Sequence, residues 1–345
     1  MPTIFHTEQE IYSQPEIWRK TVESFKEMDI KGLPDFRNYD QTIFIGCGST
    51  YYLSIWAGRL LRENHVVDVL ELPSSEVMLT PQIWAPKSKR TLLVSVSRSG
   101  ETSETIQAVR AFREQSHGDV LAITCYPDSE LSKLADWVIG IPGAQETSIA
   151  QTRSFTNMML GVALFISGSV PDDTGALLFD TGKNVLEKYK KTAEEIGRNG
   201  DLNSFFFLGS GKRYGLACEA MLKLKEMSLT YSEAYHFLEF RHGPMAMVDE
   251  NCLIVGLLGD ESSDLEFDVL KDMKEFGARI LVLAPEKDKF MADEFDEFVS
   301  LGTQVTSIWL QPLYLPILQT IALERSFGKG LNPDQPTHLE AVVRL

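Results

Sequence analysis

Three hydroxyl side chains surround a glycine in the segment 97–102 (SRSGET), between an apolar run and a helical pattern. A helix N-terminus presents unpaired N–H groups and a partial positive charge, and glycine lets the backbone approach a ligand closely. Ser97, Ser99 and Thr102 add hydroxyl donors, so the segment predicts a phosphate-binding site. Plain N-capping is the alternative, but three hydroxyls around one glycine favour phosphate.

A second glycine-rich turn, residues 46–50 (GCGST), follows another apolar run. In a parallel sheet, both turns open at the carboxyl edge of the strands, where ligands bind. This turn alone is a weak signal, and a tight turn without a ligand is an equal alternative. A third corner, Gly259-Asp260-Glu261, carries two carboxylates that repel phosphate, so we expect one phosphate site per chain.

Two carboxylates and a lysine share one face of a predicted helix, because Glu219, Lys223 and Glu226 have i, i+4, i+7 spacing. A solvated face with an ordinary Glu–Lys pair is the alternative. His242 follows shortly afterwards, before Gly-Pro, which predicts a loop. A lone histidine is usually structural, but a carboxylate and a histidine can also act as a base and acid pair.

Short β-rich runs alternate with helical patterns along the chain, which predicts α/β units with parallel sheets. The runs are nearly continuous in apolar residues, as expected for strands covered on both faces. A helix is expected from about Thr102, with Thr105, Ala108, Val109 and Phe112 on one face. The expected strands are Thr42–Gly46, Thr91–Ser97, Asp119–Thr124, Trp137–Ile141, Ser204–Leu208, Cys252–Leu258, Arg279–Ala284 and Ser307–Leu310.

A weak internal repeat links the two halves of the chain. The segment 43–50 (IFIGCGST) is an apolar run entering a glycine-rich turn, and 206–213 (FFLGSGKR) repeats this about 163 residues later. We therefore expect two tandem α/β units. A polar helical stretch between Asp173 and Gly200 contains the boundary, which divides the chain into 1–180, with the phosphate site, and 181–345.

The amino-acid composition limits the classes of partner that this protein is expected to bind. Lys and Arg number 33 and Asp and Glu 49, a net charge of −16, which argues against nucleic-acid or anionic-membrane partners. The four cysteines lack metal spacing, so we expect reduced thiols and a cytoplasmic location. The sequence has no metal cluster or dinucleotide motif, so we expect no cofactor or metal. No secretory signal follows Met1. The longest apolar stretch, Met158–Ile166, is shorter than the roughly 18–20 residues of a membrane span.

Several motifs, in one order along nearly the whole chain, resemble the sugar isomerase (SIS) domain family, and more closely the isomerase half of glucosamine-6-phosphate synthase. The matching segments are 10–15 (EIYSQP), 47–50 (CGST), 97–102 (SRSGET), 150–156 (AQTRSFT), Glu219–Glu226, Glu239–Pro244 and 329–336 (KGLNPDQP).

The resemblance implies two tandem SIS domains, each a flavodoxin-like three-layer αβα unit with a parallel sheet. It also implies a sugar-phosphate substrate. Its phosphate would contact Ser97, Arg98, Ser99 and Thr102, with Ser49 and Thr50 closing the pocket, and its sugar would contact Gly48, Ile149, Ala150 and Gln151.

The resemblance also implies catalytic roles. Glu226 would move a proton between C1 and C2 of the open-chain sugar, and Glu219 and Lys223 would line the same site. His242 would assist ring opening from the neighbouring subunit of a homodimer. These residues suit the chemistry, since proton abstraction beside a carbonyl needs a positioned carboxylate, and Lys223 supplies charge for an enediol or enolamine intermediate.

Three departures separate this chain from the synthase. Only nine residues precede Glu10 and none is cysteine, so we expect no glutaminase activity. Ala341 stands where the family tail carries a Schiff-base lysine, so no imine forms there. Arg98 replaces an uncharged residue and offers a guanidinium fork for phosphate, while Gln151 and Arg153 also differ and reshape the sugar end.

The leading hypothesis is deamination of glucosamine 6-phosphate to fructose 6-phosphate and ammonia, the synthase chemistry in reverse. The substrate then brings its own nitrogen, which makes the missing lysine less damaging. The alternatives are a deglycase of amine-linked fructose phosphates, a plain ketose–aldose isomerase and a non-catalytic phosphosugar sensor. A sensor needs no base, so the pair of Glu226 and His242 argues against it.

Overall fold

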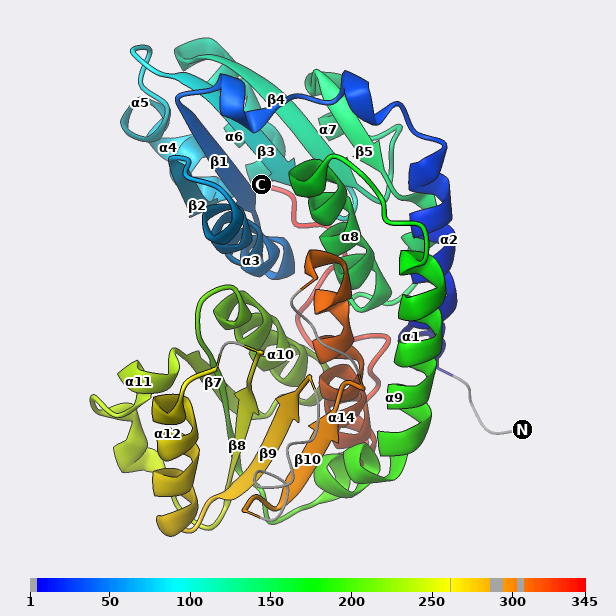
Figure 1. Cartoon of the computed structure of the whole chain (residues 1–345), viewed down its shortest axis with the longest axis vertical. Coiled ribbons are helices and arrows are strands. Elements are labelled where there is room, and N and C mark those ends of the chain that lie inside the picture. The colour runs from blue at the N-terminus through cyan, green and yellow to red at the C-terminus, as the bar shows by residue number, and fades with distance from the viewer. Residues whose placement is uncertain (1–4, 261, 286–293, 303–306) are drawn as a thin grey trace. The chain divides into compact units, whose positions relative to one another are not determined.

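The computed structural model describes residues 5–260, 262–285, 294–302 and 307–345 (Figure 1). The chain divides into two compact units, and each is made from separate stretches of sequence. The first unit comprises Glu16–Glu146, Arg153–Gly175 and Glu340–Leu345, and the second comprises the described part of Met1–Pro15, Thr147–Thr152 and Ala176–Leu339.

A parallel five-stranded sheet forms the centre of the first unit, with the strand order β2-β1-β3-β4-β5. Every residue of β1 is buried, because helices cover both faces of the sheet. The strands are β1 (Gln41–Gly46), β2 (Val69–Pro73), β3 (Arg90–Val96), β4 (His117–Thr124) and β5 (Trp137–Gly140).

The helices α3 and α8 pack on one face of this sheet, and α4, α5, α6 and α7 lie together on the other. Short 3-10 turns connect several elements. The bounds are α2 (Gln14–Lys26), η1 (Ile30–Gly32), η2 (Phe36–Asn38), α3 (Ser49–Asn64), α4 (Ser74–Leu79), α5 (Pro81–Trp84), α6 (Ser103–Gln115), α7 (Glu130–Leu134), η3 (Pro142–Ala144) and α8 (Arg153–Ser167).

The second unit repeats the design, with a parallel sheet in the order β10-β9-β8-β6-β7. Numbered from its own first strand, this is the strand order of the first unit. The strands are β6 (Ser204–Gly209), β7 (Tyr231–Tyr235), β8 (Cys252–Leu257), β9 (Arg279–Ala284) and β10 (Glu297–Ser300).

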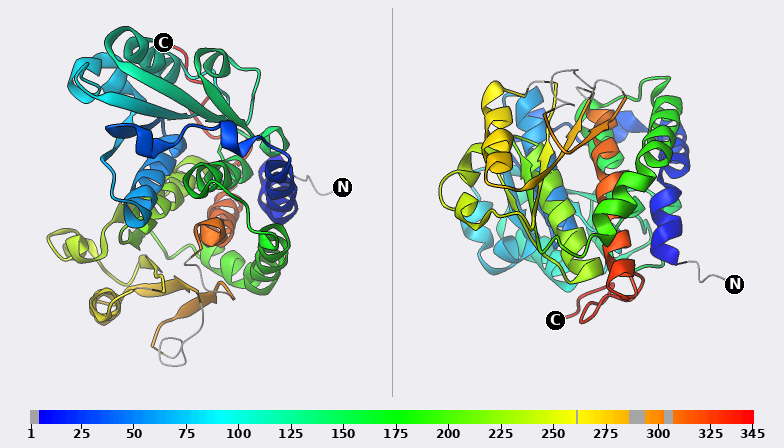
Figure 2. Two further views of the ribbon diagram at one scale, coloured as in Figure 1. Left: turned by 45° about the horizontal axis from the view of Figure 1, so that its top comes forward. Right: turned by 90° about the horizontal axis from the view of Figure 1, so that it is seen from below.

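In the second unit, α10 and α14 pack together beside β6 and β7, and α11 and α12 lie over the cluster of core side chains on the other face. Figure 2 shows the same elements from two further directions. The bounds are α1 (His6–Tyr12), α9 (Thr174–Arg198), α10 (Arg213–Ser228), α11 (Phe237–Phe240), η4 (Pro244–Met247), α12 (Asp264–Glu275), η5 (Ile308–Tyr314) and α14 (Leu315–Gly328).

Two pairs of glycines show which residues of the two units correspond to each other. Gly48 and Gly211 have nearly equal positive φ values of 55° and 56°. A Cβ on Gly46 would lie 2.3 Å from the backbone of Thr50, and one on Gly209 would lie 2.5 Å from the backbone of Arg213. Both pairs are 163 residues apart, so the repeat expected from the sequence is confirmed.

Most of the expected strands are present, within about a residue or two at either end, and the buried face expected for α6 is confirmed. The strand expected at Ser307–Leu310 is wrong. This stretch begins a 3-10 helix, because Ser307 Oγ accepts a hydrogen bond from Trp309 N and Pro312 cannot donate to a sheet. The sequence reading missed β2, β7 and β10, which are short and largely half-buried.

The proposed division between residues 180 and 181 falls inside α9. Glu261, one of the two carboxylates expected at the third corner, lies outside the described residues. In the described part of the chain, no helix combines the length and the apolar character that a membrane span requires.

Candidate phosphosugar site

The segment 97–102 connects β3 to α6, as the sequence predicts, and its geometry requires glycine. Gly100 has a φ of 65°, in the left-handed region, and a Cβ there would lie 2.0 Å from Ser129 Oγ. Leu131 N donates to Gly100 O at 3.0 Å, which ties the turn to the start of α7. The close fit against Ser129 and the hydrogen bond from Leu131 therefore hold the turn in one shape.

Two of the expected phosphate ligands also shape this turn. Ser97 Oγ accepts from Gly100 N at 3.1 Å, and Ser99 Oγ accepts from Glu101 N at 3.1 Å. A hydroxyl that accepts a hydrogen bond keeps its own O–H to donate elsewhere. Thr102 is the N-cap of α6, and its side chain makes no capping hydrogen bond. The turn-forming and phosphate-binding roles are thus compatible.

The second glycine-rich turn connects β1 to α3, and β1 pairs in parallel with β3, so the two turns open at one edge of the sheet. Gly48 is exposed and Ser49 is buried at the first turn of α3. Thr50 Oγ1 donates to Cys47 O and accepts from Cys47 N, both at 2.9 Å. Thr50 therefore holds its own turn together.

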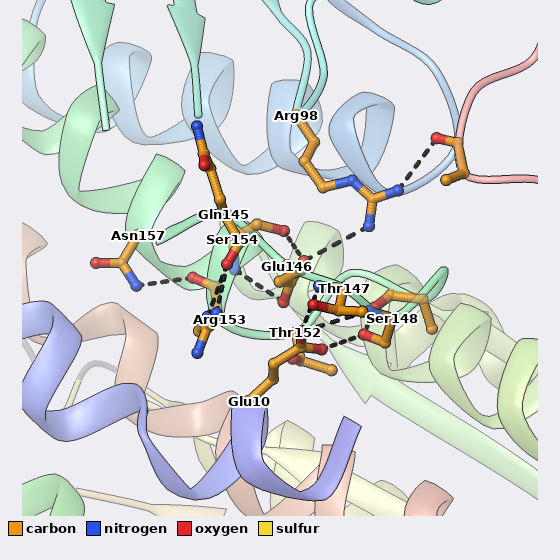
Figure 3. Close-up of polar contacts among 12 residues, drawn as sticks. Glu10, Arg98, Gln145, Glu146, Thr147, Ser148, Thr152, Arg153, Ser154 and Asn157 are labelled. Atoms are coloured by element: carbon orange, nitrogen blue, oxygen red, sulfur yellow. Dashed lines mark hydrogen bonds and ion pairs between the residues drawn. The ribbon is translucent and has the colours of Figure 1, made fainter. Parts of the chain in front are cut away.

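Arg98 is not a freely exposed phosphate fork. It is 8% exposed, and its Nη1 lies 3.6 Å from Oε2 of Glu146, whose side chain is fully buried (Figure 3). Glu146 also accepts hydrogen bonds from Ser154 N at 3.1 Å and from Ser154 Oγ, at the start of α8. This buried ion pair, which the sequence reading missed, anchors the Arg98 guanidinium.

The tail Glu340–Leu345 lies on the same corner. Arg98 Nη2 donates to Ala341 O at 3.1 Å, and Ser103 N, in the first turn of α6, donates to Val343 O at 3.2 Å. Leu345 N donates to Ser103 Oγ at 3.2 Å. Backbone atoms of the tail thus engage a helix terminus of the kind that binds anions.

The corresponding corner of the second unit, between β8 and α12, is closed by its own side chains. Ser263 and Glu266 form a reciprocal capping box, in which Ser263 N donates to Glu266 Oε2 at 2.9 Å. Gly259 N donates to Ser262 Oγ at 2.8 Å. The N-terminus of α12 already holds a carboxylate, which disfavours a phosphate there.

Glu219, Lys223 and Glu226 lie together on α10, as their spacing predicts. Lys223 Nζ lies 2.5 Å from Glu226 Oε2 and 3.4 Å from Glu219 Oε1. The side chains of Glu219 and Lys223 are fully buried, and that of Glu226 is 19% exposed. The solvated-face alternative is therefore excluded for Glu219 and Lys223.

The matching helix of the first unit shows what packing alone favours. Shifted by 163 residues, Glu219 and Lys223 correspond to Trp56 and Leu60 of α3, which are 0% and 1% exposed. Removing charges from water is costly, even when they pair with one another. The second unit thus buries a carboxylate and an ammonium at positions where the same fold elsewhere buries apolar side chains.

His242 is exposed on the turn after α11, where Gly243 has a φ of 122°. His242 N donates to Glu239 O at 3.0 Å. Neighbouring Arg241 pairs with Asp272 of α12 at 2.5 Å, which fixes the turn. Within the described residues, no hydrogen bond or ion pair joins the His242 side chain to the three charged residues of α10, so the expected base and acid pair stays a prediction.

The segment 147–152 contains the other expected sugar ligands and belongs to the second unit. Ala150 is 2% exposed, and Ile149 is half-buried. Gln151 Oε1 is buried, and the part of the chain that the structure describes gives this atom no hydrogen-bond partner. A buried acceptor of this kind suits a sugar hydroxyl.

Lys329 supports α10 from its C-terminal end, a role that the sequence reading missed. Its Nζ donates to Ser228 O, Leu229 O and Thr230 Oγ1 at 2.8, 3.0 and 3.0 Å. A cation suits the carbonyl end of a helix. Burial, together with the charge of Arg325, lowers the pKa of the Lys329 ammonium. The sequence did point to Lys329, because it is the first residue of the matching segment 329–336.

In the described residues, no cluster of three or more His, Cys, Asp or Glu side chains has the arrangement of a metal site. The polar groups described above are suited instead to binding an anion and moving protons.

Comparisons with known proteins identify relatives along nearly the whole chain. The chain is 25% identical over 345 residues to glutamine–fructose-6-phosphate aminotransferase of Methanothermobacter thermautotrophicus, covering 97% of this chain and 56% of the relative. It is 28% identical over 342 residues to the Sulfolobus acidocaldarius enzyme, with the same coverage. The chain therefore spans about half the length of these curated relatives.

Solved structures share the fold over nearly their whole length. Tagatose-6-phosphate ketose/aldose isomerase of Escherichia coli matches with a TM-score of 0.87 at 21% identity, covering 99% of each chain. Glucosamine-6-phosphate deaminase of Thermotoga maritima matches with a TM-score of 0.81 at 24% identity, covering 99% of this chain and 100% of that one. The SIS domain model matches residues 35–167 and 201–324, one segment for each sheet, and this chain belongs to the SIS domain family.

Proposed function

We propose that this protein is a phosphosugar isomerase that deaminates glucosamine 6-phosphate to fructose 6-phosphate and ammonia. The observation that carries the proposal is the charged set on α10, in which buried Lys223 pairs with buried Glu219 and partly exposed Glu226. Packing favours apolar residues at the first two of these positions, so their charge has another use. Proton transfer beside a carbonyl is the use that fits a carboxylate held by an ammonium.

The phosphate group of the substrate is assigned to the corner 97–102. The hydroxyls of Ser97, Ser99 and Thr102 provide donors, and Ser49 and Thr50 close the pocket. Arg98 contributes positive charge from its place beside Glu146 and does not act as a free fork. The residues assigned to the sugar itself are Gly48, Ile149, Ala150 and Gln151.

The reaction begins from the open-chain aldehyde. Glu226 removes the proton from C2, which gives an enolamine, and returns it to C1. A proton leaves the nitrogen and O1 gains one, so the product is the C2 imine of fructose 6-phosphate. Water adds to this imine, and the C2–N bond breaks to give the ketone and ammonia. No redox partner is required, since every step moves protons or water.

The charges on α10 suit this sequence. Lys223 Nζ, 2.5 Å from Glu226 Oε2, orients the base and offers positive charge to the oxygen on which negative charge develops. Glu219, 3.4 Å away on the preceding turn, balances the ammonium inside the helix packing. Ala341 cannot form a Schiff base, but the substrate amine makes that step unnecessary.

His242 is proposed to assist ring opening in the neighbouring subunit of a homodimer. Its exposure on a turn fixed by the Arg241–Asp272 pair suits donation to another chain. A monomer of 38.8 kDa in size-exclusion chromatography with full activity would contradict this shared site.

The experiment is to incubate the protein with glucosamine 6-phosphate and to assay ammonia and fructose 6-phosphate separately. Equal amounts of both products are expected, and unphosphorylated glucosamine should give neither. Galactosamine 6-phosphate, amine-linked fructose 6-phosphates and tagatose 6-phosphate complete the set. Turnover of only an amine-linked fructose phosphate would replace deamination by deglycation, and interconversion of only ketose and aldose phosphates would mark a plain isomerase.

A thermal shift with phosphosugars, but no turnover of any of them, would instead indicate a sensor. That outcome would overturn the catalytic part of the proposal and retain the phosphate site.

A further inference from the structure

We infer that Glu10 is a positioning residue that holds the segment 147–152 in the shape that meets the sugar. This inference rests on the proposed function, because that segment contains Ile149, Ala150 and Gln151. Glu10 lies on α1, far from the segment in sequence, and its side chain points toward Thr147 and Ser148 (Figure 3). All of these residues belong to the second unit.

The carboxylate of Glu10 binds the beginning of the segment through three donors. Oε1 accepts from Thr147 N at 2.6 Å and from Ser148 N at 3.3 Å, and Oε2 accepts from Ser148 Oγ. Glu10 is 3% exposed and Ser148 is 2% exposed, so water does not readily replace these bonds. Buried backbone N–H groups need such partners, which makes the carboxylate essential to this shape.

A second buried chain of hydrogen bonds holds the end of the segment. Gln319 Nε2, on α14, donates to Thr152 O at 3.3 Å. Gln14 Nε2 donates to Gln319 Oε1 at 2.8 Å and to Ile11 O at 3.0 Å. Gln14 and Gln319 are both fully buried. Glu10 and Gln14 therefore fix the two ends of the segment from one short stretch of sequence.

This arrangement explains why a carboxylate, and not an amide, suits position 10. The three groups described above all donate to Glu10, and a carboxylate accepts with both of its oxygens. An amide keeps one acceptor and has an NH₂ group in place of the other, so the Ser148 hydroxyl would have to accept from it and donate its own proton to Ala150 O. A shift of Thr147 and Ser148 would be passed directly to Gln151, whose buried Oε1 is the acceptor proposed for the sugar.

The test compares Glu10→Gln with Glu10→Asp and with the control Glu8→Gln on the same helix. Glu10→Gln should lower kcat/KM for the phosphosugar by about 10–100-fold, as expected when buried donors lose an ionised acceptor. The affinity for inorganic phosphate should fall much less, because the turn 97–102 is held by its own hydrogen bonds. Glu10→Asp should recover part of the loss, and Glu8→Gln should behave as the wild type.

Hydrogen exchange provides a second readout that needs no substrate. The amides of Thr147 and Ser148 should exchange faster in Glu10→Gln than in the wild type, while those of α10 should not. Unchanged exchange, together with wild-type kinetics, would overturn the inference. An equal loss of phosphosugar and inorganic-phosphate affinity would also overturn it, since it would indicate general destabilisation.

The proposed function fails separately, if the wild type turns over no phosphosugar. The exchange experiment would still report whether Glu10 holds the segment, and the difference in phosphosugar affinity between Glu10→Gln and the wild type would report whether the segment contacts the sugar.

Discussion

The two units have the same strand order and the same glycine pairs, yet they place their polar groups at different points of the fold. In the first unit the polar groups gather at the corner between β3 and α6, and α3 buries Trp56 and Leu60. In the second unit the equivalent corner is closed by the Ser263–Glu266 box, and α10 buries Glu219 and Lys223.

The difference shows that two copies of one fold can carry different polar groups. Each unit has one group of polar residues that packing alone does not require. At the equivalent position, the other unit has an ordinary structural contact. In the proposed function, anion binding belongs to the N-terminus of α6, where Thr102 makes no side-chain cap, and proton transfer belongs to α10, whose core positions are charged. Five predictions test this division, from the largest expected effect to the smallest.

Glu226→Gln should lower kcat by about 10²–10⁴-fold, the usual contribution of a positioned acid or base. The matched control is Glu63→Gln, which changes the equivalent position of α3 and should leave kcat unchanged. Phosphosugar affinity should be retained, as measured by equilibrium binding to the inactive variant. Activity of Glu226→Gln within about tenfold of the wild type, roughly 1.4 kcal/mol, would remove Glu226 from the role of base.

Lys223→Leu should destabilise the protein by about 3–5 kcal/mol, because it leaves buried carboxylates without their cation. The double variant Glu219→Leu/Lys223→Leu makes α10 resemble α3, and it should recover most of that stability while remaining inactive. Urea unfolding of both variants is the measurement. A double variant as unstable as the single one would show that the charges are needed for packing.

Gly100→Ala should cost about 1–3 kcal/mol of stability, because it forces a left-handed backbone and places a methyl group against Ser129. It should also weaken inorganic-phosphate binding. Gly48→Ala is the control, since Gly48 has a φ of 55° but open space around its Cβ. Equal losses in both variants would mean that backbone strain alone, and not the fit against Ser129, requires Gly100.

Arg98→Lys should weaken phosphosugar binding by about tenfold, since a lysine cannot hold both Glu146 and the Ala341 carbonyl. Removal of residues 340–345 should have a similar effect. If the two changes act through the same contact, their combination should cost little more than either one. Additive losses, measured by calorimetry, would separate the roles of the arginine and the tail.

Cys47 offers the smallest test, because the equivalent residue of the second unit is Ser210. Burial raises the pKa of the Cys47 thiol above its ordinary value of 9.0. The unfolded chain then loses this proton first, so the stability from the buried thiol is present below pH 9 and falls as the pH rises through the folded-state pKa. Cys47→Ser should lose less stability than the wild type between pH 8 and pH 10, and parallel unfolding curves would contradict this.

The sequence predicted the features that depend on neighbouring residues. The apolar runs predicted most strands, the glycine-rich segments predicted both corners, and the spacing of Glu219, Lys223 and Glu226 predicted their shared face. Ser307–Leu310 was misassigned, because its apolar residues suit either a strand or a buried 3-10 helix. The helix forms because Ser307 caps it and Pro312 cannot donate to a sheet.

Contacts between distant parts of the sequence could not be predicted. Nothing near Arg98 indicates that Glu146 neutralises it, and nothing near Glu10 indicates that Ser148 lies against it. The burial of Lys223 was also hidden, since a charged pair with helical spacing is usually exposed. These are the contacts that decide how the candidate site works, and they arise only when the units fold.

The division of each unit into separate stretches of sequence has a consequence for biosynthesis. Arg98 and its partner Ala341 are 243 residues apart, so the corner at residues 97–102 leaves the ribosome long before the tail that contacts it. A nascent first unit therefore passes through a stage in which its sheet is complete but this corner lacks its last partner. Chaperones or early ligands would meet the corner in that open state, and removal of residues 340–345 from the full chain would reproduce it permanently.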